Sequence, residues 1–193
     1  VSTYDRDIAR AQAEAAVAAG MELHAYVFLK PDDDPITQVT AALNKMADLP
    51  VTRLWLDVEG SPEDSPPQRW DILSGFGGIA QFIQKAIDTC ATRGMPTGIY
   101  TSRSWWLLWM DDSNGFAHSP LWNATNDQLG DLSFTPYGGW TECEMEQFAF
   151  NLPVAGVNTD WNAIALAPPP EPELPQPTPE LPQTYREAYE DAH

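Results

Sequence analysis

Two carboxylates stand one residue apart in the segment RLWLDVEG, residues 53–60. The apolar residues before them predict a buried strand, and because strand side chains alternate, Asp57 and Glu59 point to the same side. Their Cα atoms are expected about 6–7 Å apart, so one charge raises the pKa of the other. An acid that stays protonated near neutral pH can donate a proton to a leaving group, as in glycoside hydrolysis. The alternative is a strand that ends at the protein surface, where both carboxylates are solvated and have no catalytic role.

Strands and helices alternate around this segment in the first half of the chain, which implies parallel pairing of the strands. The second half has more strands and shorter links. The fold class expected is therefore α/β: an irregular TIM-like β/α barrel with few helices in its second half. An open doubly wound sheet is the rival fold, but no glycine-rich phosphate loop follows a strand. Strands are expected at 21–29, 52–59, 96–102, 120–125 and 144–150, and residues 156–166 close the compact part. Helices are expected at 4–20, over 32–50 with Asp34 as N-cap and Pro35 at the first helical position, and at 70–93 with an interruption at 75–78, followed by a short helix or turn at 103–110.

Catalytic groups of such barrels lie at the C-terminal ends of the strands. Leu54, Leu56 and Val58 are expected to face the outer helices, with Trp55, Asp57 and Glu59 toward the barrel axis. Aromatic and hydrogen-bonding side chains at the other strand ends suit a sugar cleft, although each of them alone could be a core or turn residue. These candidates are Tyr26, Phe28, Tyr100, Trp122, Asn123, Gln147, Asp160 and Asn162.

Composition excludes several function classes. The formal net charge of −18 argues against nucleic acid and against anionic membranes as partners. The sequence has no run of 18 apolar residues, so no transmembrane helix is expected. The N-terminal residues show no charged-then-apolar pattern of a signal peptide. The 43% hydrophobic content indicates a folded globular protein with a sizeable core.

The composition changes at Ala167. Eight of the 18 prolines lie in residues 167–193, which predicts an extended acidic tail or linker after a catalytic domain at 1–166. The tail carries six acidic residues against one arginine, a net −5, so the remaining −13 belongs to residues 1–166.

No metal or cofactor site is expected. Cys90 and Cys143 are best explained as two buried thiols. The three histidines, His24, His118 and His193, have no ligand spacing.

Six short motifs, in this order, resemble the glycoside hydrolase family 25 muramidases, also called lysozymes of that family. They are AGMELHAYVF, LWLDVE, GIYTSRSWW, PLWNA, EQFAF and GVNTDWN, and the resemblance runs from about residue 4 to residue 166.

This resemblance implies an irregular β/α barrel that cleaves the β-1,4 bond between N-acetylmuramic acid and N-acetylglucosamine in peptidoglycan. Glu59 matches the proton donor of the family and Asp57 its carboxylate partner, and the N-acetyl group of the substrate assists as nucleophile. Cleft positions of the family are matched by Tyr26, Phe28, Tyr100, Trp122, Gln147 and Asp160.

Three departures from the family pattern stand out. The family's first strand, which carries another active-site aspartate, has no counterpart, so a barrel truncated at its N-terminus is expected. Glu146 and Phe148 stand where the family has aromatic residues in the motif WQY. His24 stands where glycine is usual, and we expect it to pack or hydrogen-bond rather than bind a ligand.

Peptidoglycan glycan strands are the expected partner, and the expected location is extracellular or cell-wall-associated, with a phage endolysin as one source. Two alternatives stay open: a non-catalytic glycan-binding or structural relative of the same fold, and an unrelated barrel hydrolase. The sequence leaves the oligomeric state open.

Overall fold

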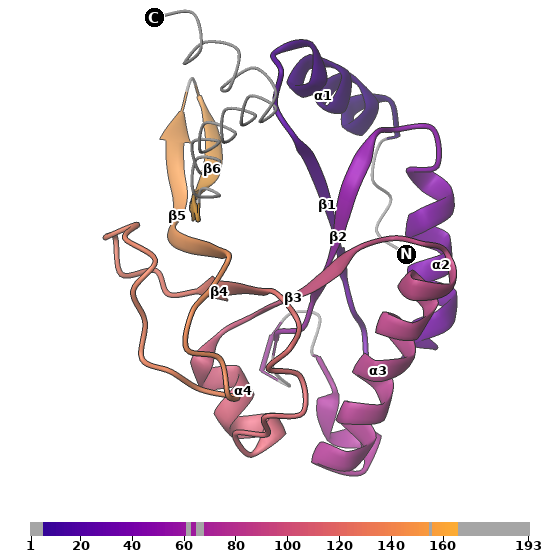
Figure 1. Ribbon diagram of the computed structural model, residues 1–193, viewed down its shortest axis with the longest axis vertical. Coiled ribbons are helices and arrows are strands. Elements are labelled where there is room, and N and C mark those ends of the chain that lie inside the picture. Colours follow the sequence, from indigo (N-terminus) through magenta and orange to yellow (C-terminus); the bar gives the residue numbers. More distant parts are fainter. Residues whose placement is uncertain (1–5, 61–62, 65–67, 155, 166–193) are drawn as a thin grey trace, which may run out of the picture.

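The computed structural model describes residues 6–60, 63–64, 68–154 and 156–165. Helices and strands alternate over the first two thirds of this part, and strands alone follow (Figure 1). In chain order the elements are α1 (Arg6–Ala18), β1 (Leu23–Phe28), α2 (Pro35–Lys45), β2 (Val51–Asp57), the 3₁₀ helix η1 (Trp70–Leu73), α3 (Phe76–Thr92), β3 (Thr97–Thr101), α4 (Arg103–Met110), β4 (Leu121–Ala124), β5 (Met145–Val154) and β6 (Val157–Ile164).

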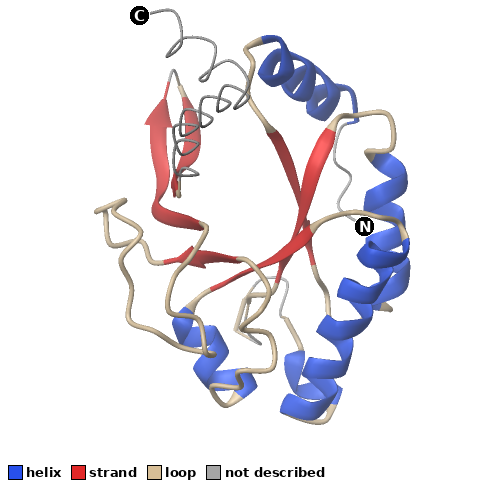
Figure 2. Cartoon of the chain, in the orientation of Figure 1, coloured by secondary structure: helices blue, strands red, loops and turns tan. Residues whose placement is uncertain are grey.

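The strands form one sheet in the order β1–β2–β3–β4–β5–β6. The first five strands are parallel, and β6 pairs antiparallel with β5. The sheet curls into half a barrel, with α2, α3 and α4 outside it (Figures 1 and 2). The predicted α/β class and the loss of helices along the chain are both confirmed. Within the described residues, β1 and β6 are the two edges of this sheet.

Local sequence explains where the helices begin and end. The Asp34 side chain caps α2 by accepting a hydrogen bond from the Thr37 backbone N–H at 2.9 Å, and Pro35 occupies the first helical position as predicted. An interruption is present as predicted, but at Ser74–Gly75 rather than over the whole of 75–78, so Gly77 and Gly78 lie inside α3. Ser74 and Gly75 have φ angles of 61° and 77°, which no α-helix accommodates, so η1 ends there and α3 begins at Phe76.

The main core lies between the outer face of the sheet and the helices. As predicted, Leu54, Leu56 and Val58 point outward and are fully buried, together with Ile79 and Ile83 of α3. Five parallel strands covered by helices need such apolar side chains because no water reaches this layer.

Trp55 is fully buried on the opposite, concave face of the sheet. It pairs in register with Gly98 of β3, and a Cβ atom at Gly98 would lie 2.4 Å from Trp55 Cζ3. The indole of Trp55 therefore occupies the space that a side chain at 98 would need.

Several aromatic side chains pack against α4 and form a second part of the core. Trp106 contacts Trp140 with a ring-centroid separation of 4.8 Å, and Tyr137 and Phe116 surround this pair. These rings anchor the long connection between β4 and β5, which has no helix of its own.

The other predictions about organisation have mixed outcomes. Cys90 and Cys143 are both buried and unpaired, as predicted. In the described parts of the chain, no helix combines the length and apolarity needed to cross a membrane. The predicted proline-rich segment 167–193 lies outside the described residues.

Candidate functional site

Asp57 is the last residue of β2 and is only 6% exposed. The strand was expected to continue to Glu59, and this prediction is wrong, because Glu59 lies in the turn that follows. Backbone hydrogen bonds to both neighbouring strands end here: Leu29 N–H donates to the Asp57 carbonyl at 3.0 Å, and Val58 N–H donates to the Tyr100 carbonyl at 2.9 Å.

Two tryptophans hold the turn that carries Glu59. Trp70 Nε1 donates to the Glu59 carbonyl at 2.8 Å, and Trp105 Nε1 donates to the Gly60 carbonyl at 3.1 Å. Gly60 has φ 91°, and a Cβ there would lie 2.4 Å from Gln68 Cγ, so only glycine fits. Sequence reasoning missed Trp70 and Trp105. The motif GIYTSRSWW was a signal for Trp105, because it places this residue shortly after the strand that ends near Thr101.

Both carboxyl groups are harder to ionise than ordinary ones. Burial, followed by the charge of Glu59, raises the pKa of Asp57 well above its usual value. Burial, followed by the charges of Asp64 and Asp160, raises the pKa of Glu59. The expected mutual repulsion is therefore present at Asp57, but desolvation is the larger cause at both residues. Asp57 Oδ1 is buried and accepts no hydrogen bond from a described residue.

A chain of hydrogen bonds connects three of the expected residues on the concave face. Tyr100 Oη donates to Gln147 Oε1 at 2.5 Å, and Gln147 Nε2 donates to Asp160 Oδ2 at 3.1 Å. The backbone N–H of Asn151 donates to Asp160 Oδ1 at 2.9 Å. The pKa of Tyr100 is raised by burial and then by the charges of Glu59 and Asp57, so this hydroxyl stays protonated and remains a donor.

The ring of Trp122 extends the same face. Its centroid lies 4.9 Å from that of Tyr100 and 5.7 Å from that of Trp55, both in edge-to-face geometry. Trp122 Nε1 donates to Asn162 Oδ1 on β6 at 2.9 Å. Asn123, the next residue, instead turns to the other face, where its Oδ1 accepts from buried Tyr137 Oη at 2.8 Å.

The two candidates on β1 lie at the edge of the sheet. Tyr26 is 53% exposed, and its proximity to Tyr100 contributes to the raised pKa of that residue. Phe28 is half-buried and pairs in register with Asp57. His24 accepts a hydrogen bond from Trp55 Nε1 at 3.2 Å, which confirms the expectation that it packs and hydrogen-bonds.

This arrangement suits proton transfer beside a polar and aromatic surface. A protonated carboxylic acid at Glu59 can donate to a leaving oxygen, and exposed ring faces can stack on sugar rings. Among the described side chains, no group of three or more His, Cys, Asp or Glu residues is arranged to hold a metal ion.

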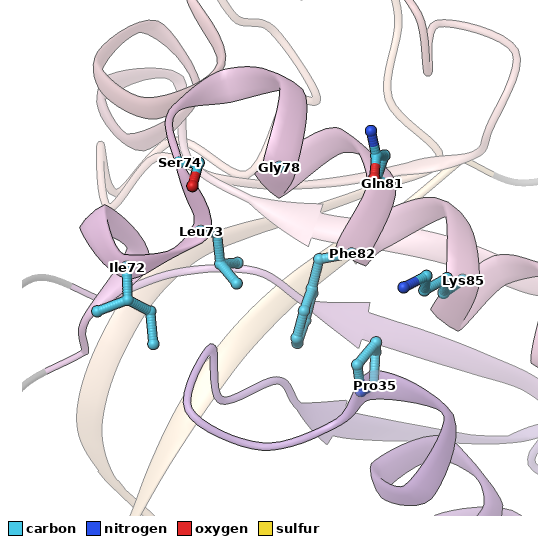
Figure 3. A pocket seen from close by; sticks show the side chains of 8 residues that line it. All are labelled: Pro35, Ile72, Leu73, Ser74, Gly78, Gln81, Phe82 and Lys85. Atoms are coloured by element: carbon cyan, nitrogen blue, oxygen red, sulfur yellow. The ribbon is translucent and has the colours of Figure 1, made fainter.

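Two cavities lie outside this face. One, of about 300 Å³, lies in the helical layer between the start of α2, η1 and α3, and is lined by Pro35, Ile72, Leu73, Ser74, Gly78, Gln81, Phe82 and Lys85 (Figure 3). The described residues that line it include none of the expected site residues and no acidic side chain. The other, of about 590 Å³, lies at the C-terminal ends of β3 and β4.

Comparison with known proteins gives consistent results for sequence and fold. A family model described as Lysozyme-like protein 1 matches residues 2–148. Probable GH family 25 lysozyme 5 of Dictyostelium discoideum is 34% identical over 155 residues, covering 77% of this chain and 68% of that protein. Probable GH family 25 lysozyme 3 of the same organism is 28% identical, and the match covers 77% of this chain but only 31% of that longer protein.

A solved structure shares the fold. The family GH25 lysozyme from Aspergillus fumigatus superimposes with a TM-score of 0.65 at 19% sequence identity, covering 82% of this chain and 75% of that one.

Proposed function

The chain belongs to the glycoside hydrolase family 25 lysozymes, and from that premise we propose that it hydrolyses the β-1,4 bond between N-acetylmuramic acid and N-acetylglucosamine in peptidoglycan. The observation that carries the proposal is the pair of Asp57 and Glu59 at the C-terminal end of β2, both with raised pKa values. Active sites of parallel β/α barrels lie at this end of the strands.

Glu59 is the proton donor in this proposal. Its carboxyl group is partly buried, and Asp64 and Asp160 oppose its ionisation, so it stays protonated closer to neutral pH than an ordinary glutamate. The two tryptophan hydrogen bonds, to the Glu59 and Gly60 carbonyls, fix the backbone that follows the Glu59 Cα atom, which limits the positions that its side chain can reach. A fixed, protonated acid can protonate the glycosidic oxygen as the bond to the sugar breaks.

Asp57 acts beside it as the carboxylate partner. It lies on the same face, and its buried Oδ1 has no hydrogen-bond partner among the described residues, so the hydrogen-bonding capacity of this atom stays unused until a donor reaches it. An N–H of the substrate's N-acetyl group is the donor proposed here. This contact would orient the acetyl oxygen toward the anomeric carbon, where it acts as the nucleophile.

The remaining residues bind the glycan. Tyr26, Phe28 and Trp122 provide ring surfaces for sugar stacking on β1 and β4. Gln147 uses its amide oxygen for Tyr100 and its amide nitrogen for Asp160, so the orientation of its amide group is fixed. Asp160 then offers carboxylate oxygens to sugar hydroxyls at the exposed end of this chain of hydrogen bonds.

Glu59→Gln tests the assignment, because it keeps the size of the side chain and removes the acid. We expect the rate of lysis of purified walls to fall by about 10²- to 10⁴-fold, the usual contribution of a general acid. Glu63→Gln, four residues on, is a matched control and should retain activity. Lysis that persists in Glu59→Gln would exclude Glu59 as the acid, and wall binding by the wild type without turnover would identify a glycan-binding protein instead.

The proposed site of action is the bacterial cell wall, outside the cytoplasm, with peptidoglycan strands as the partner. The large negative charge of the chain makes no contribution to docking on an anionic wall, so recognition has to come from local contacts.

A further inference from the structure

The cavity of about 590 Å³ lies at the same end of the sheet as the proposed site and is not part of it. Ser102 enters its wall two residues after Tyr100, so their Cα atoms are separated by about 7 Å of extended chain. Its volume falls within the range of sites for small ligands, about 300–1,000 Å³. The lining is mostly hydroxyl and amide: Ser102, Arg103, Ser104, Asn123, Ala124, Thr125, Asp127, Ser133, Phe134 and Thr135.

Part of the cavity lining comes from the connection between β4 and β5, and a buried side chain of β5 hydrogen-bonds to this connection. Glu146 is fully buried, and its two oxygens accept hydrogen bonds from the Leu132 backbone N–H at 2.8 Å and from Thr125 Oγ1 at 3.1 Å. Asn123 on β4 is 2% exposed, and its side chain accepts a hydrogen bond from Tyr137 Oη, which links β4 to the same connection. The connection between β4 and β5 is thus fixed at both ends of the part that lines the cavity, and the cavity is a built feature of the fold.

The cavity carries one charge of each sign. Arg103 and Asp127 are exposed, and neither forms an ion pair with any residue that the structure describes. In the part of the chain that the structure describes, one oxygen of Asp127 accepts a hydrogen bond, from the Leu129 backbone N–H at 3.0 Å, and the other oxygen accepts none. A guanidinium with no ion-pair partner among the described residues, in a chain of net charge −18, is available for a carboxylate ligand.

We propose that this cavity binds the peptide stem of peptidoglycan, with a stem carboxylate at Arg103 and the ammonium group of its diamino acid at Asp127. The proposal rests on the proposed function, because the stem is attached to the N-acetylmuramic acid next to the cleaved bond. Stem peptides carry both free carboxylates and an amine, which matches the two charges, and their alanine methyl groups suit contact with Phe134. A glycan without peptides has no group that would use both charges.

Titration of the ¹⁵N-labelled chain with the synthetic peptide N-acetyl-L-Ala-γ-D-Glu-L-Lys-D-Ala, followed by NMR, tests this inference. We expect shifts confined to residues 102–104 and 123–135, and binding about threefold to tenfold weaker in Arg103→Gln, as for loss of a charge-assisted contact in a partly exposed site. Arg103→Lys should recover part of the affinity. Arg93→Gln removes the same charge at the opposite end of β3 and should bind as the wild type does.

Acetylation of the lysine side chain in the peptide tests the second contact. It should weaken binding to the wild type but have little further effect on Asp127→Asn, whose ammonium partner is already gone. Shifts located elsewhere, or equal affinity of Arg103→Gln and wild type, would overturn the inference.

The two proposals fail separately. Wall lysis by the wild type combined with peptide binding that ignores Arg103 would remove the stem site and leave the muramidase. Arg103-dependent peptide binding without hydrolysis of any wall would remove the muramidase and leave the stem site.

Discussion

The hydrogen bond between Tyr100 and Gln147 makes a quantitative prediction about stability. Tyr100 Oη and Gln147 Oε1 are 2.5 Å apart, and each residue is only 8% exposed. Tyr100→Phe removes the donor and leaves the Gln147 oxygen buried without its partner. Leaving such a group unsatisfied costs about 1–3 kcal/mol of the free energy of unfolding. At about 2–4 °C per kcal/mol for a domain of this size, the melting temperature should fall by roughly 2–12 °C.

The second single variant removes the other partner. Gln147→Leu leaves Tyr100 Oη without its acceptor and should be destabilised by a similar amount, whereas the exposed Asp160 can replace its lost donor with water. The double variant Tyr100→Phe, Gln147→Leu has neither buried polar group. We therefore expect it to be more stable than the sum of the single losses predicts, with a coupling of about 1–2 kcal/mol.

Urea unfolding at neutral pH, followed by tryptophan fluorescence, measures all four proteins. The midpoint should move and the slope should stay the same, because the surface exposed on unfolding hardly changes. If the two single losses add to the double loss within about 0.5 kcal/mol, the side chains are not coupled. The ordered chain from Tyr100 to Asp160 would then not exist in solution.

Three further predictions concern the buried acids and the glycine beside Trp55. Because the folded-state pKa of Asp57 is raised, the stability that this residue contributes is present at low pH and is lost as the pH rises above the unfolded-state pKa of about 3.9. The gain in unfolding free energy of Asp57→Asn over the wild type should therefore be larger at pH 7 than at pH 4. An equal difference at both pH values would contradict this. Asp64→Asn removes a charge that raises the pKa of Glu59, so the alkaline limb of kcat/KM should move to lower pH, while Asp88→Asn on α3 should leave it in place. Gly98→Ala should lose about 1–3 kcal/mol to the clash with Trp55, whereas Gly77→Ala, with no atom within 4 Å, should be neutral or gain up to about 1 kcal/mol; thermal denaturation that ranks them in the reverse order would refute the packing of Trp55.

Much of the fold could be predicted because local chemistry and tertiary structure agree. Asp34–Pro35 caps α2, and the alternation of Leu54, Trp55 and Leu56 correctly assigns the two faces of β2. The end of β2 could not be predicted from the pattern LDVE, which alternates regularly through Glu59. It ends earlier because Gly60 takes a positive φ. In addition, the indole N–H groups of Trp70 and Trp105, which lie farther along the chain, donate hydrogen bonds to the carbonyls of Glu59 and Gly60.

The candidate site was predictable as a set of strand ends, but its electrostatics were not. Spacing suggested that Asp57 and Glu59 raise each other's pKa, whereas burial is the larger cause, and burial depends on packing that no single segment specifies. Glu146 is a similar case. The sequence marked it only as a departure from a family pattern, and its role in holding the β4–β5 connection follows from contacts with Thr125 and Leu132.

The identity of the new reducing end tests the central claim most directly. Purified peptidoglycan digested with the wild type, reduced with borohydride and analysed by mass spectrometry should yield fragments that end in reduced N-acetylmuramic acid. Glu59→Gln under the same conditions should yield none above the enzyme-free control. Fragments that end in reduced N-acetylglucosamine, or the same muramic ends from Glu59→Gln, would contradict a muramidase that uses Glu59 as its proton donor.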